Sequence, residues 1–481
     1  MRGIKPLDSN LKLKSGIIIT FIAKYSNIIA QLIINSVLAR LLMPEEFGVI
    51  AIITVFISFF NILGDMGLGP AIIQNKSLED KEVSDIFKFS IIAAVLAAVL
   101  FYFFSYFIAF FYDNSIYIKL GKLLSFSVFF SICNIVPSAL IYKKHNFKLI
   151  GIINISINII VGIVTIILAL KGWSYYSLIV DSILKSIFIF ILSFIFCGIR
   201  IKKGYSYSSI KKIRTYSSYQ FSFNFINYFT RNLDNIMIGK FLGSATLGYY
   251  DKAYKLMLYP VQNLTNVITP VLHPVLSEYQ DKREMIYNTY MKVIRILAYM
   301  GIFVTVYCFF TSTEIIYIMY GKNWEQAIPI FRVLSLSIVI QMVLSSIGAI
   351  FQSTGYVNKL FSTGVVSAGF TITAIIIGIL SERIIILAAG IVISFALNFI
   401  QCFYVLVTEV FNKSFSKFLM ELKNVVVVGF IMVVGYLLIW NISISNIFIS
   451  ALVKLIVGVI SYLIGLIITK EYKALKSLIL K

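Results

Sequence analysis

About fourteen stretches of this chain are long and apolar enough to cross a lipid bilayer as α-helices. A helix needs about 20 apolar residues to span the hydrocarbon core, where its backbone polar groups have to bond within the same segment. Of the 481 residues, 59% are hydrophobic and only 13% are charged, whereas about a quarter of the residues of a soluble domain are charged. The sequence therefore predicts an all-α polytopic membrane protein.

The predicted spans follow one another with short connections. They cover residues 16–38, 47–64, 89–111, 120–142, 149–170, 175–196, 216–239, 247–268, 293–313, 328–352, 360–380, 384–407, 425–439 and 447–468. The first of them is too long for the apolar core of a signal peptide and lacks a cleavage site, so it is predicted to be the first membrane helix.

The basic residues of the connections indicate the orientation. With the N-terminus inside, the inner segments carry 27 lysines and arginines and the outer segments carry six. Positive residues accumulate on the cytoplasmic side, so both termini are predicted to be cytoplasmic. These loops also account for most of the net charge of +21, which suits anionic lipid headgroups, and binding to nucleic acid is not expected. The longest outer connection has about fourteen residues, so any substrate has to be handled among the helices.

The cysteine and histidine residues do not indicate a disulfide set or a metal site. The cysteines are widely spaced and lie in or beside apolar segments, at Cys133, Cys197, Cys308 and Cys402. They are predicted to be small buried hydrophobic residues. The two histidines, His145 and His273, lack the spacing of metal ligands, so no metal is expected.

An offset of 200 residues aligns the beginning of the chain with its second half. The identities are Phe21 with Phe221, Asn27 with Asn227, Asn35 with Asn235, Leu42 with Leu242, Gly48 with Gly248, Pro70 with Pro270 and Ser77 with Ser277. Both segments have the order helix, short turn, helix, proline, and the glycines and prolines match without a gap. The pattern predicts an internal repeat.

The same offset aligns two stripes of polar side chains. In the first span they are Lys24, Asn27, Gln31 and Asn35, and in the seventh span Gln220, Asn224, Asn227, Arg231, Asp234 and Asn235. At 100° per residue, each set falls on one face of its helix. A charged residue at the bilayer centre costs about 2.5–3.5 kcal/mol, so neither face is expected to contact lipid.

Two environments explain such a stripe. One is a seam of hydrogen bonds between neighbouring helices, and the other is a water-filled cavity lined by both stripes. The occurrence of matching stripes in the two halves favours the cavity. Lys24 and Arg231 would make this cavity positive, and Asp234 lies at the right spacing to pair with Arg231.

Other charged residues within the spans have simpler interpretations. Asp181 and Lys185 are one turn apart and are expected to neutralise each other. Asp251, Lys252 and Lys255 open the eighth span, where the interface between membrane and water is the simpler location.

Three features remain less clearly explained. Arg332 in the tenth span is a candidate for the second-half side of the cavity, whereas Lys454 in the last span has no evident partner. Residues 76–88 alternate acids and bases, which is typical of a solvated surface linker.

Four segments of the chain together resemble a known family. They are Leu38–Gly48 (LARLLMPEEFG), Asp65–Gln74 (DMGLGPAIIQ), Asn232–Gly243 (NLDNIMIGKFLG) and Leu247–Tyr250 (LGYY). They resemble the Wzx-type polysaccharide flippases of the multidrug/oligosaccharidyl-lipid/polysaccharide exporter superfamily. The likeness covers most of the chain and is strongest over residues 10–280.

The resemblance implies an architecture and a transport cycle. It implies two pseudo-symmetric six-helix lobes, residues 1–200 and 201–410, around a central cavity, with two additional helices in residues 411–481. The first and seventh helices would line the cavity, and access would alternate between the two sides of the membrane. The implied substrate is an oligosaccharide on a polyprenyl diphosphate. It would be moved from the inner to the outer leaflet for assembly of O-antigen, capsule, exopolysaccharide or teichuronic acid.

The polar stripes suit such a substrate. Lys24 and Arg231, together with Lys255 or Arg332, are predicted to bind the diphosphate. The amides predicted to bond sugar hydroxyls are Asn27, Gln31, Asn224, Asn227 and Asn235, and the remaining predicted lining residues are Asn35, Gln220 and Asp234. No cofactor is expected, and coupling to a proton or a sodium gradient is compatible with the resemblance. The expected location is the bacterial inner membrane, and the expected partners are anionic lipids and other glycan-assembly membrane proteins.

Other functions were weighed against the same residues. A multidrug exporter would prefer acidic residues in its cavity, whereas this stripe is positive. A membrane glycan polymerase needs a sizeable outer loop, and the sequence shows no nucleophile–base pair or phosphate-binding glycine loop, so an enzyme is not expected. A flippase for the peptidoglycan lipid precursor stays open as an alternative.

Overall fold

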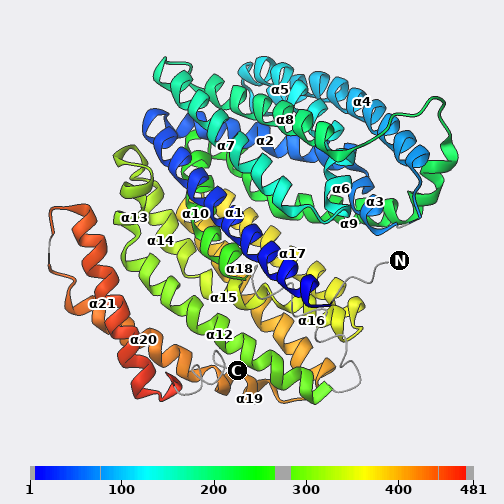
Figure 1. Ribbon diagram of the computed structural model, residues 1–481. Coiled ribbons are helices and arrows are strands. Elements are labelled where there is room, and N and C mark those ends of the chain that lie inside the picture. Colours follow the sequence, from blue (N-terminus) through cyan, green and yellow to red (C-terminus); the bar gives the residue numbers. More distant parts are fainter. Residues whose placement is uncertain (1–5, 76, 266–282, 443, 473–481) are drawn as a thin grey trace. The chain divides into compact units, whose positions relative to one another are not determined.

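The computed structural model spans residues 1–481 and describes all of them except residues 1–5, 76, 266–282, 443 and 473–481. Some side chains within helices are also outside the description, namely those of residues 6–23, 208, 212–220, 222–224, 226, 227, 229, 230 and 357. The described residues form helices joined by turns and contain no strand (Figure 1). The predicted all-α class is confirmed.

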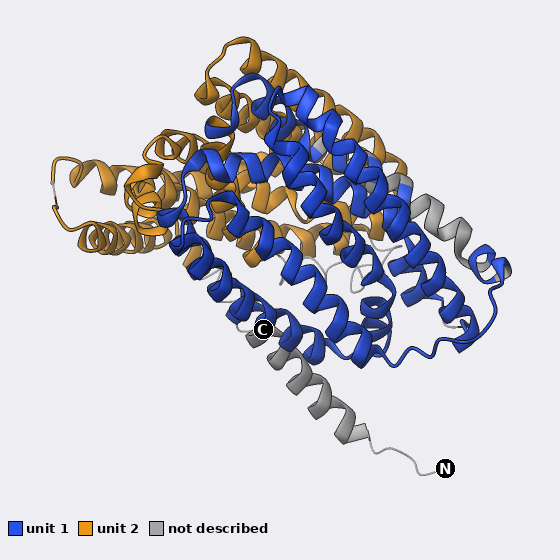
Figure 2. Ribbon diagram, turned by 90° about the horizontal axis from the view of Figure 1, so that it is seen from above, with its two compact units in different colours: residues 1–245 blue, residues 246–481 orange. Residues whose placement is uncertain are grey.

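The chain divides into two compact units, residues 1–245 and 246–481 (Figure 2). The helices of unit 1 are α1 (Pro6–Leu41), α2 (Pro44–Asp65), α3 (Leu68–Gln74), α4 (Asp80–Tyr112), α5 (Ile116–Cys133), α6 (Ile135–Lys143), α7 (Phe147–Leu170), α8 (Tyr175–Cys197) and α9 (Tyr207–Phe241). Within this unit, α1 packs on α7, and α9 packs on α2, α3 and α4. The predicted lobe boundaries at residues 200 and 410 stay a prediction.

Unit 2 contains the remaining helices, the first of which begins at the boundary. They are α10 (Ser244–Thr265), α12 (Arg283–Phe310), α13 (Ser312–Met319), η1 (Lys322–Trp324), α14 (Ala327–Ser335), α15 (Ile338–Leu344), α16 (Ile347–Ser353), α17 (Val357–Leu380), α18 (Ile384–Tyr404), η2 (Val405–Val410), α19 (Phe415–Glu421), α20 (Lys423–Leu438) and α21 (Ile447–Ile468). The two helices predicted as an addition to a twelve-helix core, α20 and α21, are part of this unit.

A helix lies at each of the fourteen predicted span positions, although not all of these helices qualify as spans by themselves. Among the described residues, ten helices are long and apolar enough to cross a membrane. The pair Ala327–Ser335 and Ile338–Ser353, bent by 48°, would be an eleventh span. The helices α1, α9 and α10 are not among these, and α9 and α10 are rich in polar residues. The exact count of fourteen is therefore not confirmed.

The turns explain the motifs that resemble the flippase family. Pro44 is the first residue of α2. Proline has no backbone N–H, but the first N–H groups of a helix have no acceptor within the helix, so proline costs no hydrogen bond at this position. The backbone N–H of Met43 donates to Oε2 of Glu46 at 2.6 Å, which caps the same helix end. Gly67 begins α3 with a φ of +73°, a conformation that glycine adopts without steric cost. These residues therefore end one helix and start the next.

Helix boundaries recur at the predicted offset of 200 residues. The first helix ends at Leu41 and α9 ends at Phe241, and the helices that follow begin at Pro44 and Ser244. Gly48 and Gly248 are both buried in the first turns of their helices. The local structure thus follows the repeat that the sequence predicts.

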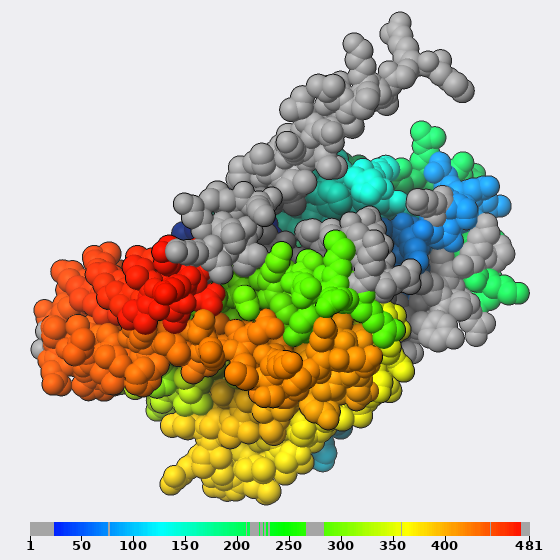
Figure 3. Space-filling model, turned by 90° about the horizontal axis from the view of Figure 1, so that it is seen from below, coloured from blue at the N-terminus to red at the C-terminus, as the bar shows by residue number. Residues whose placement is uncertain are grey.

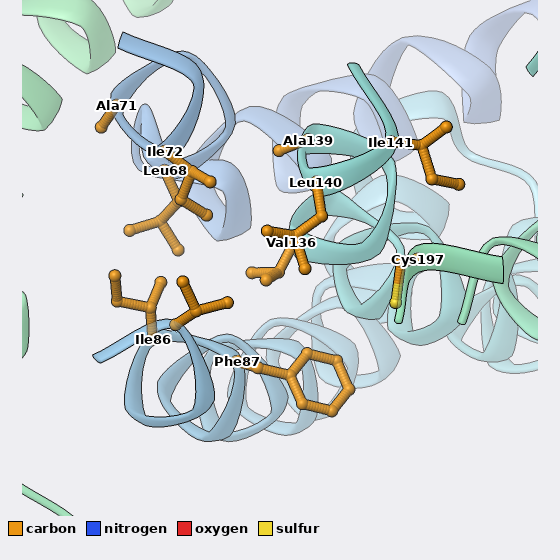
Figure 4. Close-up of a cluster of buried hydrophobic side chains, with 11 residues drawn as sticks. Leu68, Ala71, Ile72, Ile86, Phe87, Val136, Ala139, Leu140, Ile141 and Cys197 are labelled. Carbon is orange, nitrogen blue, oxygen red and sulfur yellow. The ribbon is translucent and has the colours of Figure 1, made fainter. Parts of the chain in front are cut away.

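A buried apolar cluster in unit 1 joins α3, α4 and α6 to the end of α8. Leu68 and Ile72 of α3, Phe87 of α4 and Val136 of α6 belong to this cluster, together with Cys197 at the end of α8 (Figure 4). These five residues are 2% exposed or less. Like Cys197, the other three cysteines are buried and free, which confirms their predicted role as small hydrophobic residues.

The last two helices are packed closely against the rest of unit 2. Helix α20 packs on α12, and α21 packs on α20, α12 and α13; the red surface of α21 adjoins the orange surface of the preceding segment (Figure 3). A Cβ atom added at Gly435 would lie 2.0 Å from the Ser461 hydroxyl oxygen, so glycine permits the close approach of α20 and α21.

Candidate functional site

Helix α1 has two exposed strips of opposite character. Ile29 and Ile33 are 57% and 59% exposed, and Lys24 and Gln31 are exposed on another side of the helix. At 100° per residue, the two strips lie roughly 140–200° apart. Because a lysine and a glutamine are costly to expose to hydrocarbon, we assign the isoleucine strip to lipid and the polar strip to water.

The amide of Asn27 has a different environment from its neighbours in the stripe. Asn158 of α7 donates an Nδ2–H to Oδ1 of Asn27 at 2.7 Å, and both side chains are partly buried. A Cβ atom at Gly162 of α7 would lie 2.3 Å from Cδ1 of Ile34, so glycine brings the two helices together beside this bond. For Asn27 this bond fits the seam interpretation, and its place in the cavity lining stays a prediction. Asn35, also half-buried, stays a predicted lining residue.

The stripe of α9 is described only at its C-terminal end. The side chains of Gln220, Asn224 and Asn227 lie outside the described residues. Arg231 is exposed, whereas Asp234 is 7% exposed and its Oδ1 accepts the N–H of Asn235 at 2.8 Å. The cationic end of the stripe is thus accessible, and the acid beside it is buried.

The two candidate cations of unit 2 already have partners. Lys255 Nζ lies 2.8 Å from Oδ2 of Asp251, which is one turn away, and the lysine side chain is 59% exposed. Arg332 donates its Nε–H to Oγ of Ser312 at 2.9 Å. The predicted grouping of Lys255 and Arg332 with the stripes of unit 1 stays a prediction.

The structure shows the surroundings of two further groups of charged residues that lie within the predicted spans. Lys185 Nζ and Asp181 Oδ2 are 2.8 Å apart, so this pair does neutralise itself as predicted. Asp251 and Lys252 are only 7% and 5% exposed, and Lys252 lies over the ring of Tyr320 at 5.5 Å. These two residues are buried inside unit 2, and their interfacial depth in the membrane stays a prediction.

Lys454, for which the sequence offered no partner, forms an ion pair in unit 2 with a buried glutamate, while its own side chain is half-buried. Its Nζ lies 2.5 Å from Oε1 of Glu314 on α13 and donates to the carbonyl of Phe310 at 3.0 Å. Ser450 donates to the same carboxylate oxygen at 2.7 Å. An intramembrane lysine predicts a partner in general, but the partner is 140 residues away in the sequence, so no local signal could identify it.

The segment predicted as a solvated linker contains a buried acid instead. Helix α4 begins at Asp80, and Asp85 is 1% exposed. Its Oδ2 accepts the Ser206 N–H at 3.3 Å and the Ser209 hydroxyl at 2.9 Å, at the N-terminus of α9. A carboxylate at this place satisfies unpaired N–H groups and complements the helix dipole. The linker prediction is therefore wrong for residues 80–88, where apolar residues at helical spacing favour a buried helix.

Loss of the Asp85 carboxylate is expected to destabilise unit 1. The Asp85→Ala variant removes the acceptor of the buried Ser209 hydroxyl and one acceptor of the Ser206 N–H, so we expect a loss of about 1–3 kcal/mol in the free energy of unfolding. Thermal unfolding of the purified protein in detergent measures it. Asp80→Ala, at the exposed start of the same helix, is expected to cost about 0.5 kcal/mol or less. Equal effects of the two variants would contradict the capping role.

No group of three or more potential metal-ligating side chains occurs in the part of the chain that the structure describes. The candidate site residues carry mainly ammonium, guanidinium and amide groups. These groups donate hydrogen bonds and bind anions and hydroxyl-rich ligands.

Comparison with known proteins assigns the chain to a family. The family described as "Polysaccharide biosynthesis protein" matches residues 37–329. The chain belongs to this family of polysaccharide biosynthesis proteins. Among curated relatives, the Escherichia coli (strain K12) protein named lipopolysaccharide biosynthesis protein WzxC is 22% identical over 414 residues, which are 83% of each chain. The teichuronic acid biosynthesis protein TuaB of Bacillus subtilis (strain 168) is 22% identical over 63% of each chain.

Solved structures support the membership of this family at the level of the fold. The lipid II flippase MurJ, in an inward closed conformation, is similar with a TM-score of 0.75 and 18% identity, over 95% of this chain and 99% of that chain. An inward-facing multidrug transporter of the MATE family has a TM-score of 0.58 and 15% identity, over 79% and 94% of the two chains. The family match and the curated relatives confirm the resemblance to Wzx-type flippases. The apolar helices and the similar folds show that this family member is a multi-pass membrane protein.

Proposed function

We propose that this protein is a flippase for a polyprenyl-diphosphate-linked oligosaccharide. It moves this substrate from the inner to the outer leaflet of the bacterial inner membrane by alternating access, and the product is used to assemble O-antigen, capsule, exopolysaccharide or teichuronic acid. Membership of the polysaccharide biosynthesis family supports the pathway. The absence of a sizeable outer loop in the sequence favours transport over an enzymatic reaction.

The observation that carries the proposal is the exposed polar strip of α1. Lys24 and Gln31 are exposed on a helix whose other exposed strip is isoleucine. A diphosphate with attached sugars is anionic and strongly hydrated, so it needs cations and amides along its path through the membrane, whereas its isoprenoid tail can stay in the bilayer. We assign the diphosphate to Lys24 and Arg231, with Lys255 or Arg332 as additional cations.

The remaining roles follow from the same chemistry. Gln31, Asn35 and the amides of α9 bond sugar hydroxyls, while Asn27 positions α1 against α7. Alternation requires two states that differ by only a few kcal/mol, with substrate or a coupled proton or sodium ion favouring one of them. In this proposal both termini are cytoplasmic, and anionic lipids and other glycan-assembly proteins are partners.

A second candidate is a flippase for the peptidoglycan lipid precursor, which the similarity in fold to MurJ favours. Both substrates carry a lipid diphosphate, so the cationic strip does not distinguish them. The glycan does distinguish them, because only the precursor is needed for growth of the cell wall.

Deletion of the gene in its own host separates the two candidates. We expect the surface polysaccharide to disappear and its lipid-linked oligosaccharide to accumulate on the inner leaflet, with normal growth and cell-wall synthesis. The measurements are surface glycan by immunoblot and lipid-linked intermediates by mass spectrometry. Unchanged surface glycan would contradict the proposal, and lysis with accumulation of the peptidoglycan precursor would favour the second candidate.

A further inference from the structure

Unit 1 contains an apolar groove between α2, α4 and α9, which we name the α4–α9 groove. Its volume is about 530 Å³, within the range of small-ligand sites. Among the side chains that the structure describes, the lining residues other than Tyr207 are apolar or glycine, and they include Phe60, Ala93, Ala97, Leu100, Ile210 and Phe221. Apolar side chains offer ordered water no hydrogen-bond partners. The chemistry of the groove therefore fits a hydrocarbon chain.

The rim of the groove faces the bilayer. Leu96 and Leu100 line it and are 59% and 60% exposed. Both belong to α4, which is long and apolar enough to span the membrane. Exposed leucines on a membrane helix contact acyl chains, so a lipid can enter the groove sideways from the surrounding bilayer.

One end of the groove adjoins a cluster of exposed cations. Tyr207 and Ile210, at the start of α9, line this end, and the exposed basic residues next to them are Arg200, Lys202, Lys203 and Lys211. The exposed acids at the start of α4 are Glu79 and Asp80, Glu82 is half-buried, and Asp85 is already bonded to the start of α9. The cations outnumber the exposed acids. By the positive-inside count they lie at the cytoplasmic surface, at the level of lipid phosphates.

Helix α4 holds this basic loop in place beside the groove. The backbone N–H of Lys202 donates to Oγ of Ser84 at 2.9 Å. Lys88 Nζ donates to the carbonyl of Gly204 at 2.5 Å and also to that of Lys202. Phe89, the residue after Lys88, lines the groove itself. The apolar chain site and the phosphate site are therefore parts of one fixed arrangement.

We propose that the α4–α9 groove binds one acyl chain of an anionic phospholipid, whose phosphate contacts the exposed cations of residues 200–211. Charge complementarity selects an anionic over a neutral headgroup. Bilayer phospholipids greatly exceed an isoprenoid carrier in amount, so mass action favours a phospholipid in a laterally open site. The bound lipid braces α9, the helix with the second polar stripe, against α4. The site does not depend on the transported substrate proposed above, because it involves other side chains.

The test is photolabelling of the full-length protein in nanodiscs of phosphatidylcholine containing a trace of phosphatidylglycerol with a diazirine on its acyl chain. Labelled peptides are identified by mass spectrometry. We expect labelling of the groove-lining parts of α4 and α9. Ala97→Phe, which fills the groove, is expected to abolish it. Lys203→Gln and Lys211→Gln are both exposed and are expected to leave the fold intact, and we expect each to reduce labelling roughly fivefold.

A second groove provides the matched control. It lies between α4 and α5, has a volume of about 480 Å³ and is lined by Ala98, the neighbour of Ala97. Ala98→Phe is expected to leave labelling of the α4–α9 groove unchanged. A phosphatidylcholine probe that labels as strongly as phosphatidylglycerol would overturn the proposal, and so would labelling that is insensitive to the lysine variants. Displacement by an equimolar polyprenyl phosphate would identify an isoprenoid as the occupant instead, which also overturns it. None of these results depends on transport.

Discussion

Replacing Lys454 by methionine is expected to lower the free energy of unfolding by about 3 kcal/mol. This value is near the lower end of the range of costs for removing one partner of a buried ion pair. Glu314 is only 7% exposed, and its Oε2 has no hydrogen-bond partner among the described residues. Without the ammonium group, this carboxylate keeps one hydroxyl donor, that of Ser450. Because Glu314 is on α13 and Lys454 on α21, the loss is expected to loosen the last helices first. Thermal unfolding and protease sensitivity of the purified protein measure both effects.

The double variant tests whether the cost comes from the stranded charge. Glu314→Gln combined with Lys454→Met removes both charges, and we expect it to recover most of the lost stability. Lys413→Met provides the control, since Lys413 and Glu284 form a more exposed pair in the same unit, with side chains 43% and 78% exposed. Its expected cost is below about 1 kcal/mol. If Lys454→Met cost no more than Lys413→Met, the ion pair would not hold α21.

Charge reversal of the stripes is expected to have the largest effect on transport. A variant with Lys24→Glu and Arg231→Glu places two carboxylates where the proposal puts the diphosphate. Each lost charge-assisted hydrogen bond costs about 1.5–3 kcal/mol, so export should fall by roughly two orders of magnitude or more. The measurement is surface glycan in a deletion strain that expresses the variant, normalised to the amount of protein in the membrane.

Two further variants separate the loss of charge from misfolding. Lys24→Arg combined with Arg231→Lys keeps both charges and is expected to retain most of the export. Lys119→Glu reverses an exposed lysine in the first turn of α5, at a position that the sequence predicts to be outside, and is expected to have no effect. Wild-type export by the doubly reversed variant would show that the diphosphate assignment is wrong.

The α1 stripe shows how far sequence alone could predict the candidate site. Its period identified one polar face, and the exposed positions of Lys24 and Gln31 agree with a face that does not contact lipid. The period could not predict that Asn27 bonds Asn158, because a seam and a water-filled path need the same residue types. Only the packing partner distinguishes the two.

The buried acids show where local patterns fail. Asp85 lies within a run of alternating charges that suggested a solvated surface, yet it caps α9 across 124 residues of sequence. Glu314 falls in the predicted outer connection between the ninth and tenth spans, yet it pairs with Lys454 across 140 residues of sequence. In both cases the charge is stabilised by a partner that no sequence window contains.

The sequence by itself determined that the chain is helical, that it spans the membrane many times, and roughly where most of the helices lie. These properties are local, because the hydrocarbon core requires each segment to satisfy its own backbone polar groups. The tertiary structure alone decided which polar side chains are paired, buried or open to water. That outcome depends on contacts between distant helices, and the free energy of a buried charge depends on the partner it meets there.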